Sequence, residues 1–582
     1  MNIDHFINRV GRSGFICLLI TMGLQGRAQP GRADDQLTRK LITPVRIVWK
    51  SDQGKIANAE RLLQPGNGQA DLGNRNLCVM QSTREGNPGI LLDFGKELHG
   101  GIQVVTGLWK GNQPVRVRIR LGESVSEAMS EIDTVKGATN DHAMRDFETK
   151  LPWLGRFETG NSGFRFLRID VLDGDVTLLL KEVSAISIYR DIPYLGSFRC
   201  SDTLLNKIWQ TGAYTVHQNM QEFLWDGIKR DRLVWVGDMH PEVAAIHAVF
   251  GHNGVVNKSL DLSRDITPIP GWMNGISAYS MWWILIQRDL YLYQGDKVYL
   301  AAQKTYLAKL AAHLAGKIDA NGAEILDGNR FLDWPSSEDP KAVHAGLQAL
   351  MVLSLSAAAE LLTTLEDQAA ARICTEAVTR LKKNVPPVND SKQAAALLSL
   401  SGLIPAGEGD RVISAGGAAN FSTFYGYYML QAMAKKGNYT GALQNIREYW
   451  GGMIKLGATS FWEDFNLAWI PGAAGIDAPV PAGMKDIHGD FGAWCYKGFR
   501  HSLCHGWASG PTPWLTEHVL GIKVIAAGCS VIRIEPHLGD LAFAEGFFPT
   551  PHGLLKVKHR KLGNGKIESV IRAPKGVKII RG

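Results

Sequence analysis

Residues 225–238 gather more groups capable of chemistry than any other short stretch of the chain. They include three carboxyl groups, two guanidinium groups and two indoles, on Asp226, Asp231, Asp238, Arg230, Arg232, Trp225 and Trp235. Carboxylates accept hydrogen bonds from sugar hydroxyls, a neighbouring arginine keeps them ionised, and indole faces pack on the C–H surfaces of sugars. The composition therefore suits a sugar-binding loop, although a solvated loop with ion pairs has the same composition.

A second candidate segment lies more than two hundred residues downstream. Glu463 stands among aromatic side chains in residues 459–465, next to Trp462. A carboxyl group that loses contact with water binds its proton more tightly, which suits a base working near neutral pH. An exposed glutamate between two core aromatic residues fits the pattern equally well. The two segments form one site only if folding brings them together.

The composition limits the classes of protein to which the chain can belong. A chain of 582 residues with 45% hydrophobic and 20% charged residues is long enough for several globular domains. The net charge of +7 is spread without a basic run that could follow a phosphate backbone, so we expect no nucleic-acid partner. The 16 tryptophans favour a sugar or aromatic ligand.

Three kinds of residue pattern follow one another along the chain. Alternating segments such as residues 115–120 predict antiparallel strands up to about residue 195, with their arginines on a solvated face. Helical periodicity then dominates to about residue 515, and Asp339 with Pro340 marks the start of one clear helix. Strands return near the end, where residues 563–565 predict a hairpin turn. The chain is therefore multidomain.

The first 28 residues have the pattern of a secretory signal peptide. Arg9 and Arg12 precede an apolar run at residues 14–24, and Ala28 marks the expected cleavage point. No later stretch has about 18 uninterrupted apolar residues, the length expected of a membrane-spanning helix. We expect export to a periplasm or the extracellular space, without membrane insertion.

Neither the cysteines nor the histidines show the spacing of a metal site. The chain has no Cys-x-x-Cys, and the histidines at 217, 240, 247 and 252 form no His-Glu-x-x-His. We therefore expect no metal and no other cofactor. Cys495 and Cys504 are the closest pair for a disulfide, but sequence leaves their geometry open.

Several weak motifs occur in one order and together resemble the bacterial α-L-rhamnosidases of glycoside hydrolase family 78. The family loop, with a first Asp, Arg-x-Arg-Leu, Trp and Gly-Asp, is matched within residues 226–238. Residues 92–101 and 162–166 resemble the family's N-terminal β-domain segments. Residues 331–334, the pair Trp462 and Glu463, and residues 502–510 resemble its later segments. The resemblance covers nearly the whole mature length.

The resemblance implies a fold and a set of domain boundaries. A central all-α (α/α) barrel of six helix hairpins is expected at residues 199–517. An N-terminal β-sandwich at residues 29–198 and a small C-terminal β domain at residues 518–582 would flank it, after a signal peptide at residues 1–28.

The resemblance also implies an activity and a set of site residues. The expected activity is exo-acting, inverting release of terminal α-L-rhamnose from a glycan or glycoside, with carboxyl groups about 6.5 to 9.5 Å apart. Asp231 corresponds to the general acid and Glu463 to the general base. The expected substrate-binding residues are Asp226, Arg230, Trp235, Asp238, Trp334, Trp462 and His505.

One departure from the family pattern leaves alternatives open. The family usually has Glu where this chain has Asp231, and a shorter side chain withdraws the carboxyl by more than about 1 Å, a displacement that costs on the order of 10²-fold in rate. Asp231 acts as the acid in a reshaped loop, or Glu222 or Glu242 takes its place, or the chain binds glycans without cleaving them. A glycosidase for another deoxy sugar is a further alternative. We favour Asp231.

Overall fold

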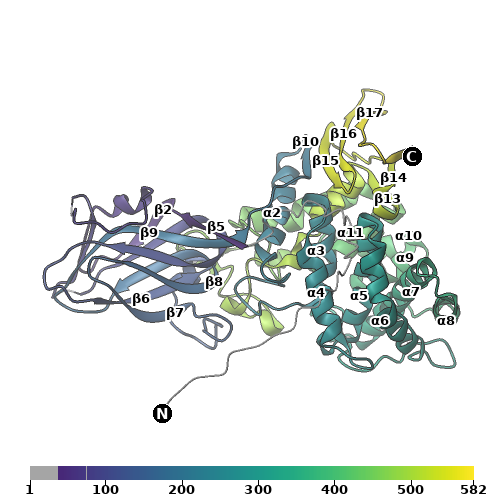
Figure 1. Ribbon diagram of the computed structural model, residues 1–582, viewed down its shortest axis with the longest axis horizontal. Helices are drawn as coiled ribbons and strands as arrows, with labels where there is room; N and C mark the ends of the chain where they lie inside the picture. Colours follow the sequence, from purple (N-terminus) through teal and green to yellow (C-terminus); the bar gives the residue numbers. More distant parts are fainter. Residues whose placement is uncertain (1–36, 74, 85) are drawn as a thin grey trace, which may run out of the picture.

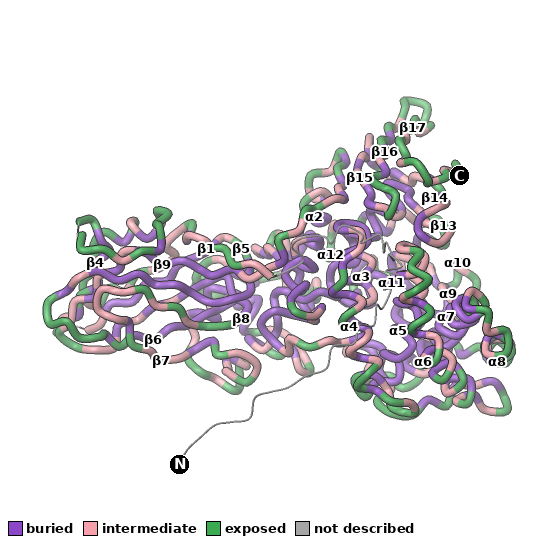
Figure 2. Tube along the Cα trace, in the orientation of Figure 1, coloured by how far each residue is buried: buried purple, intermediate pink, exposed green. Residues whose placement is uncertain are grey.

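The computed structural model describes residues 37–582 except 74 and 85, so the expected signal segment lies outside the described residues. Figure 1 shows three regions: an elongated N-terminal β region, a helical region and a small C-terminal β region packed on the helices. In Figure 2 the long central strands and inner helices are largely buried.

The N-terminal region is one antiparallel sheet. Its nine strands run in the order β3-β4-β9-β5-β8-β6-β7, with β1 on β9 and β2 on β5. They are β1 (Leu37–Ile42), β2 (Arg46–Lys50), β3 (Lys55–Ala57), β4 (Cys78–Gln81), β5 (Gly89–Thr106), β6 (Val115–Gly122), β7 (Asp146–Leu151), β8 (Arg156–Val171) and β9 (Thr177–Arg190). The expected antiparallel strands are confirmed, although they hydrogen-bond as one continuous sheet.

Alternation along these strands builds a hydrophobic core. Val117 and Ile119 on β6 are buried among the inner residues of β5, β8 and β9. The prediction that the arginines of these strands lie on a solvated face was wrong for Arg120, which is 2% exposed. Its guanidinium lies 2.7 Å from Asp170 and 3.0 Å from Glu131, so pairing offsets the cost of burial.

The middle of the chain is helical, as the periodicity predicts. The helices are α2 (Thr203–Asn219), α3 (Val236–Val249), α4 (Gly254–Asp265), α5 (Ser277–Gln294), α6 (Lys297–Ala315), α7 (Pro340–Thr364), α8 (Gln368–Leu381), α9 (Lys392–Ser401), α10 (Ala406–Ser414), α11 (Gly426–Lys436), α12 (Tyr439–Lys455) and the short α13 (Pro511–Trp514). A further short helix, α1 (Val125–Met129), belongs to the N-terminal region. Asp339 caps α7 by accepting from two amide groups, and Pro340 begins it, as expected.

The helices form a closed succession of neighbours. Helices α3, α5, α7, α9 and α11 contact one another in turn, and α13 contacts both α11 and α3. Helix α7 is apolar and long enough to cross a membrane, but 83% of its apolar window is buried inside the protein. Its apolar composition therefore follows from its place in this ring.

Helical periodicity through residues 241–260 predicts a single helix, but the structure has two helices there. The pattern at residues 241–260 divides into α3 and α4 because Gly251 takes a φ of 79° between them. A residue with a side chain rarely adopts that left-handed conformation, so glycine permits the break. The break ends α3 at Val249 and lets α4 begin at Gly254.

Two small sheets close the structure at the C-terminal end. The strands are β10 (Ser197–Cys200), β13 (Ile522–Ala526), β14 (Val531–Ile534), β15 (Phe543–Thr550), β16 (Gly553–Lys561), β17 (Ile567–Arg572) and β18 (Lys578–Arg581). One sheet has the order β10-β15-β16-β17 and the other β13-β14-β18. The predicted hairpin joins β16 to β17. Strand β10 precedes the helices, so the boundary expected at residue 199 falls within a strand.

A buried ionic cluster joins the N-terminal region to the loop between α2 and α3. The ammonium group of Lys229 lies 2.9 Å from Glu123 and 3.2 Å from Glu127. It also donates to the carbonyl oxygens of Phe499 and His501, both at 2.8 Å. Burial acts to lower the pKa of Lys229, but the two glutamates outweigh burial and raise it, so the lysine is charged.

Replacing this lysine will destabilise the chain strongly. Lys229→Met leaves the buried Glu123 without its cation and Glu127 with only Arg145, whose Nε lies 3.7 Å away, and we expect the free energy of unfolding to fall by about 3 to 5 kcal/mol. Urea unfolding followed by tryptophan fluorescence measures the change. The exposed Lys258 is the matched control, since Lys258→Met is expected to cost about 0.5 kcal/mol or less. Equal losses for the two variants would contradict the prediction.

Candidate active site

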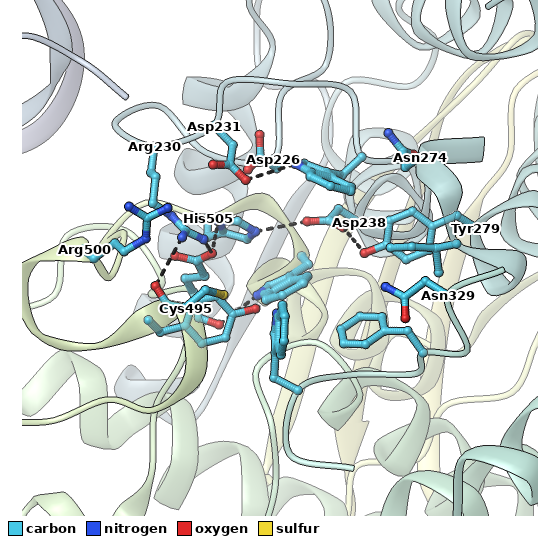
Figure 3. A pocket seen from close by; sticks show the side chains of 17 residues that line it. Asp226, Arg230, Asp231, Asp238, Asn274, Tyr279, Asn329, Cys495, Arg500 and His505 are labelled. Atoms are coloured by element: carbon cyan, nitrogen blue, oxygen red, sulfur yellow. Dashed lines mark hydrogen bonds and ion pairs between the residues drawn. The ribbon is translucent and has the colours of Figure 1, made fainter. Parts of the chain in front are cut away.

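A cavity of about 330 Å³ opens where the α2–α3 loop meets the later loops of the helical region. Figure 3 shows the 17 side chains that line it. They are Asp226, Arg230, Asp231, Trp235, Asp238, Asn274, Ile276, Tyr279, Asn329, Phe331, Trp334, Glu463, Cys495, Tyr496, Arg500, His505 and Trp507. A volume near 300 Å³ is at the small end of ligand pockets and suits a single sugar ring.

Asp226 closes the loop that carries most of the acidic groups. Its carboxylate accepts a hydrogen bond from the amide of Leu233 at 2.9 Å, and its own amide donates to the Leu233 carbonyl at 3.1 Å. The amide of Gly506 donates to the Asp226 carbonyl at 2.7 Å and ties the loop to a distant segment. Within the closed loop, Asp231 and Arg232 have φ angles of 54° and 56°, the left-handed region.

The carboxyl group of Asp231 is held by two ring nitrogens. The indole N–H of Trp235 donates to Oδ2 at 3.2 Å. Nδ1 of His142, which comes from the N-terminal region, lies 3.0 Å from Oδ1. The side chain is 19% exposed and faces the cavity, as Figure 3 shows. Asp231 is therefore fixed in place and accessible to a ligand.

Glu463 lies in the same cavity and is held by a cation. Arg230 Nη2 lies 2.5 Å from Oε1 of Glu463, and the amide of Ser502 donates to Oε2 at 3.0 Å. Burial acts to lower the pKa of Arg230, but the charges of Glu463 and Asp231 outweigh burial and raise it. The positive charge of Arg230 therefore interacts with both carboxylates and reduces the repulsion between them.

A second group of ionisable side chains forms the floor of the cavity. His505 Nε2 lies 3.0 Å from Oδ2 of Asp238, and the hydroxyl of Tyr279 donates to Oδ1 at 3.0 Å. His505 Nδ1 also lies 3.8 Å from Glu463. Burial acts to lower the pKa of His505, but Glu463 and then Asp238 outweigh it and raise the pKa to about 9. His505 is therefore protonated at neutral pH.

Burial has the opposite effect on the acids beside it. Desolvation raises the pKa of Asp238, although His505 and Tyr279 oppose the shift through hydrogen bonds. Desolvation also raises the pKa of Asp226 well above its ordinary value, while the charge on His505 acts against it. The histidinium thus opposes, without cancelling, the tendency of these buried carboxyl groups to take up protons.

Aromatic rings form the walls. Trp235 meets Tyr279 edge-on with ring centres 6.0 Å apart, and Phe331 meets Trp334 edge-on at 5.2 Å. Trp507 lies 4.5 Å from the ring of His505. Apolar walls with a polar floor suit a ligand that has C–H faces and several hydroxyl groups. The carboxyl groups of Asp231 and Glu463 face the same cavity.

A family model identifies the helical part that carries this cavity. Residues 193–386 match the bacterial alpha-L-rhamnosidase six-hairpin glycosidase domain. The resemblance inferred from the motifs is therefore confirmed. None of the curated proteins compared with the chain matches it.

Solved rhamnosidase structures share the fold of most of the chain at low sequence identity. A family 78 rhamnosidase of Bacillus sp. GL1 superposes with a TM-score of 0.71 and 22% identity, over 88% of this chain and 55% of that one. A Streptomyces avermitilis alpha-L-rhamnosidase complexed with L-rhamnose gives 0.67 and 18%, over 94% and 50%. A Klebsiella oxytoca rhamnosidase with rhamnose bound gives 0.63 and 17%, over 83% and 96%. The chain thus spans about half the length of the first two.

The structure brings together most of the site residues expected from the sequence. All of them except Trp462 line the cavity: Asp231, Glu463, Asp226, Arg230, Trp235, Asp238, Trp334 and His505. The indole of Trp462 is 1% exposed and packs edge-on against Phe465, behind the cavity lining. Glu222 is exposed and Glu242 is fully buried, and neither lines the cavity. Asp231 is the better placed acid.

Several lining residues were missed by sequence reasoning. Asn274, Tyr279 and Asn329 come from the start of α5 and from the loop before α7, and Arg500 from the segment before His505. Polar residues in such loops have no distinctive spacing. The aromatic pair at residues 282–283 forms part of the buried core, as its helical pattern predicts, and neither ring lines the cavity. The six cysteines of the described part are free, including Cys495 in the cavity wall.

The raised pKa of His505 makes stability depend on pH in a defined direction. Its pKa is about 9 in the folded chain and near the ordinary 6.5 when unfolded. The stabilisation is therefore complete below pH 6.5 and is lost as the pH rises through 9, by up to about 3 kcal/mol. Urea unfolding from pH 6 to 10 should show this loss in the wild-type chain and not in His505→Gln. The exposed His552→Gln serves as control, and an unchanged pH dependence in His505→Gln would refute the assignment.

Proposed function

We propose that this chain is an exo-acting, inverting α-L-rhamnosidase. The observation that carries the proposal is a single small cavity that holds two carboxyl groups, on Asp231 and Glu463, above a floor of sugar-binding type. A pocket of one-ring size suits a terminal sugar, and an extended cleft would suit internal ones. Membership of residues 193–386 in the rhamnosidase six-hairpin domain supports the sugar class.

The proposed reaction is a single displacement. Glu463 takes a proton from a water molecule, whose oxygen bonds to the anomeric carbon while the glycosidic bond breaks. Asp231 gives its proton to the departing oxygen, so the products are free rhamnose and the alcohol. Attack from the face opposite the leaving group inverts the configuration. Arg230, whose Nη2 lies 2.5 Å from Oε1 of Glu463, holds that carboxylate in place for this step.

The cavity floor supplies the groups that would bind the sugar. Asp226, Asp238 and His505 would accept from and donate to hydroxyl groups, while Trp235 and Trp334 would cover the C–H faces of the ring. The rhamnose complexes among the similar structures support a rhamnose-containing substrate. No step in this scheme requires a cofactor.

Two further proposals concern the architecture and the location of the protein. The closed succession of α3, α5, α7, α9, α11 and α13 supports a six-hairpin (α/α) barrel flanked by the β regions. We also propose export to the periplasm or the extracellular space, on the pattern of residues 1–28.

Removing either carboxyl group will abolish most of the activity. In Asp231→Asn we expect kcat on an aryl α-L-rhamnoside to fall by about 10²- to 10⁴-fold with KM little changed, because proton donation is lost in the transition state. Glu463→Gln should lose a similar factor. Asp175→Asn, on an exposed turn of the N-terminal sheet, is the control. Unchanged turnover in Asp231→Asn would remove this residue from the mechanism.

The stereochemistry of the product tests the single displacement. Proton NMR during the first minutes of hydrolysis should show the β anomer of L-rhamnose appearing before the α anomer. The α anomer appearing first would indicate two displacements and a covalent intermediate.

The alternatives are separated by substrate and binding measurements. A panel of aryl glycosides would reveal a preference for another deoxy sugar. Binding of rhamnose without hydrolysis over long incubation would indicate a glycan-binding protein and overturn the proposed enzyme.

A further inference from the structure

A loop of the N-terminal region reaches the wall of the cavity. The loop lies between α1 and β7, and its Lys136 carbonyl accepts from the amide of Phe499 at 2.6 Å. The Lys136 ammonium group pairs with Asp490 at 2.9 Å. The loop is therefore docked on the segment that supplies Cys495, Tyr496 and Arg500 to the cavity.

His142 in this loop stands between two charged residues. Its Nδ1 lies 3.0 Å from Oδ1 of Asp231. Its Nε2 lies 2.8 Å from Nη2 of Arg500, whose other nitrogen pairs with Asp141. Asp141, Arg500, His142 and Asp231 thus form one continuous chain of polar contacts from the N-terminal region to the candidate acid.

The arginine fixes which nitrogen of His142 carries the proton. A guanidinium group only donates, so Nε2 must accept, and we assign the proton of the neutral ring to Nδ1. Burial lowers the pKa of His142, which favours this neutral form. The Nδ1–H group then donates to Oδ1 of Asp231, 3.0 Å away. The backbone amide nitrogen of Asp231 lies 3.3 Å from the same ring nitrogen and makes the weaker contact.

The same histidine also supports the backbone on which Asp231 stands. The carbonyl of His142 accepts from Arg232 Nη2 at 3.0 Å. Asp231 and Arg232 are consecutive residues with positive φ, a conformation that persists only where the surroundings hold it. His142 thus contacts the carboxyl group of one strained residue and the side chain of the next.

We propose that His142 is a positioning residue, which aims the carboxyl group of Asp231 and stabilises the carboxylate left when Asp231 gives its proton to the departing oxygen. The inference rests on the proposed function. It makes the N-terminal region a part of the active site. Trp235 supports the other oxygen, so the carboxylate formed in the reaction has a donor on each side.

The test compares two amide variants on two substrates. The amide nitrogen of His142→Asn takes the place of Nδ1, while that of His142→Gln takes the place of Nε2 and leaves Asp231 without its donor. A methoxyphenyl rhamnoside needs full protonation of its leaving group, and a dinitrophenyl rhamnoside needs little. We expect kcat of His142→Gln to fall about 10- to 100-fold on the first and less than about 3-fold on the second.

His142→Asn should remain within about 3-fold of the wild-type enzyme on both substrates. His142→Ala, which has no donor, should follow His142→Gln and replaces it if that variant does not fold. The exposed His552→Ala is the control, and thermal melting checks that each variant is folded.

Two results would overturn the inference while leaving the proposed function intact. One is an active enzyme whose His142 variants lose equal factors on both substrates, which would indicate a merely structural residue. The other is a set of variants with unchanged rates. A wild-type chain that hydrolyses no rhamnoside would instead overturn the proposed function and this inference with it.

Discussion

Two adjacent cations determine the path of the loop between α2 and α3. Lys229 points into the N-terminal region and pairs with Glu123 and Glu127, while Arg230 points to the cavity and pairs with Glu463. All of these groups are buried, so moving the loop would leave uncompensated charge in a medium that solvates it poorly. The position of Asp231, next in the chain, follows from this double attachment.

Cations inside the cavity offset part of the charge of its carboxyl groups. Asp226, Asp238 and Glu463 lie around the protonated ring of His505, and Arg230 adds a second cation. A neutral sugar brings no charge, so a site for it must be neutralised by protein groups alone. Because the groups are desolvated, their dipoles and charges act on a ligand with little screening by water. The same desolvation makes each partner costly to remove.

The sequence indicated most of the cavity residues that lie where unusual residue types gather along the chain. It did not indicate residues whose place depends only on the path of the backbone. Trp462 and Glu463 are neighbours in a segment without regular secondary structure, and only Glu463 lines the cavity. His142 was not singled out, because a lone histidine in a polar loop has no pattern. Helix α9 was missed because almost every side chain is buried and periodicity disappears. Arg120 shows that alternation cannot separate a solvated face from one covered by a loop.

Strand β10 lies just before the first helix of the helical region in the sequence. It hydrogen-bonds to β15, which follows the last helix. Ser197 on β10 lies opposite Phe547 on β15, so the whole run of helices is an insertion between two neighbouring strands of one small sheet. Backbone hydrogen bonds between β10 and β15 therefore hold the two ends of the helical region together. A protease that nicks any connection between the helices would cut the polypeptide and still leave both fragments anchored to the same sheet.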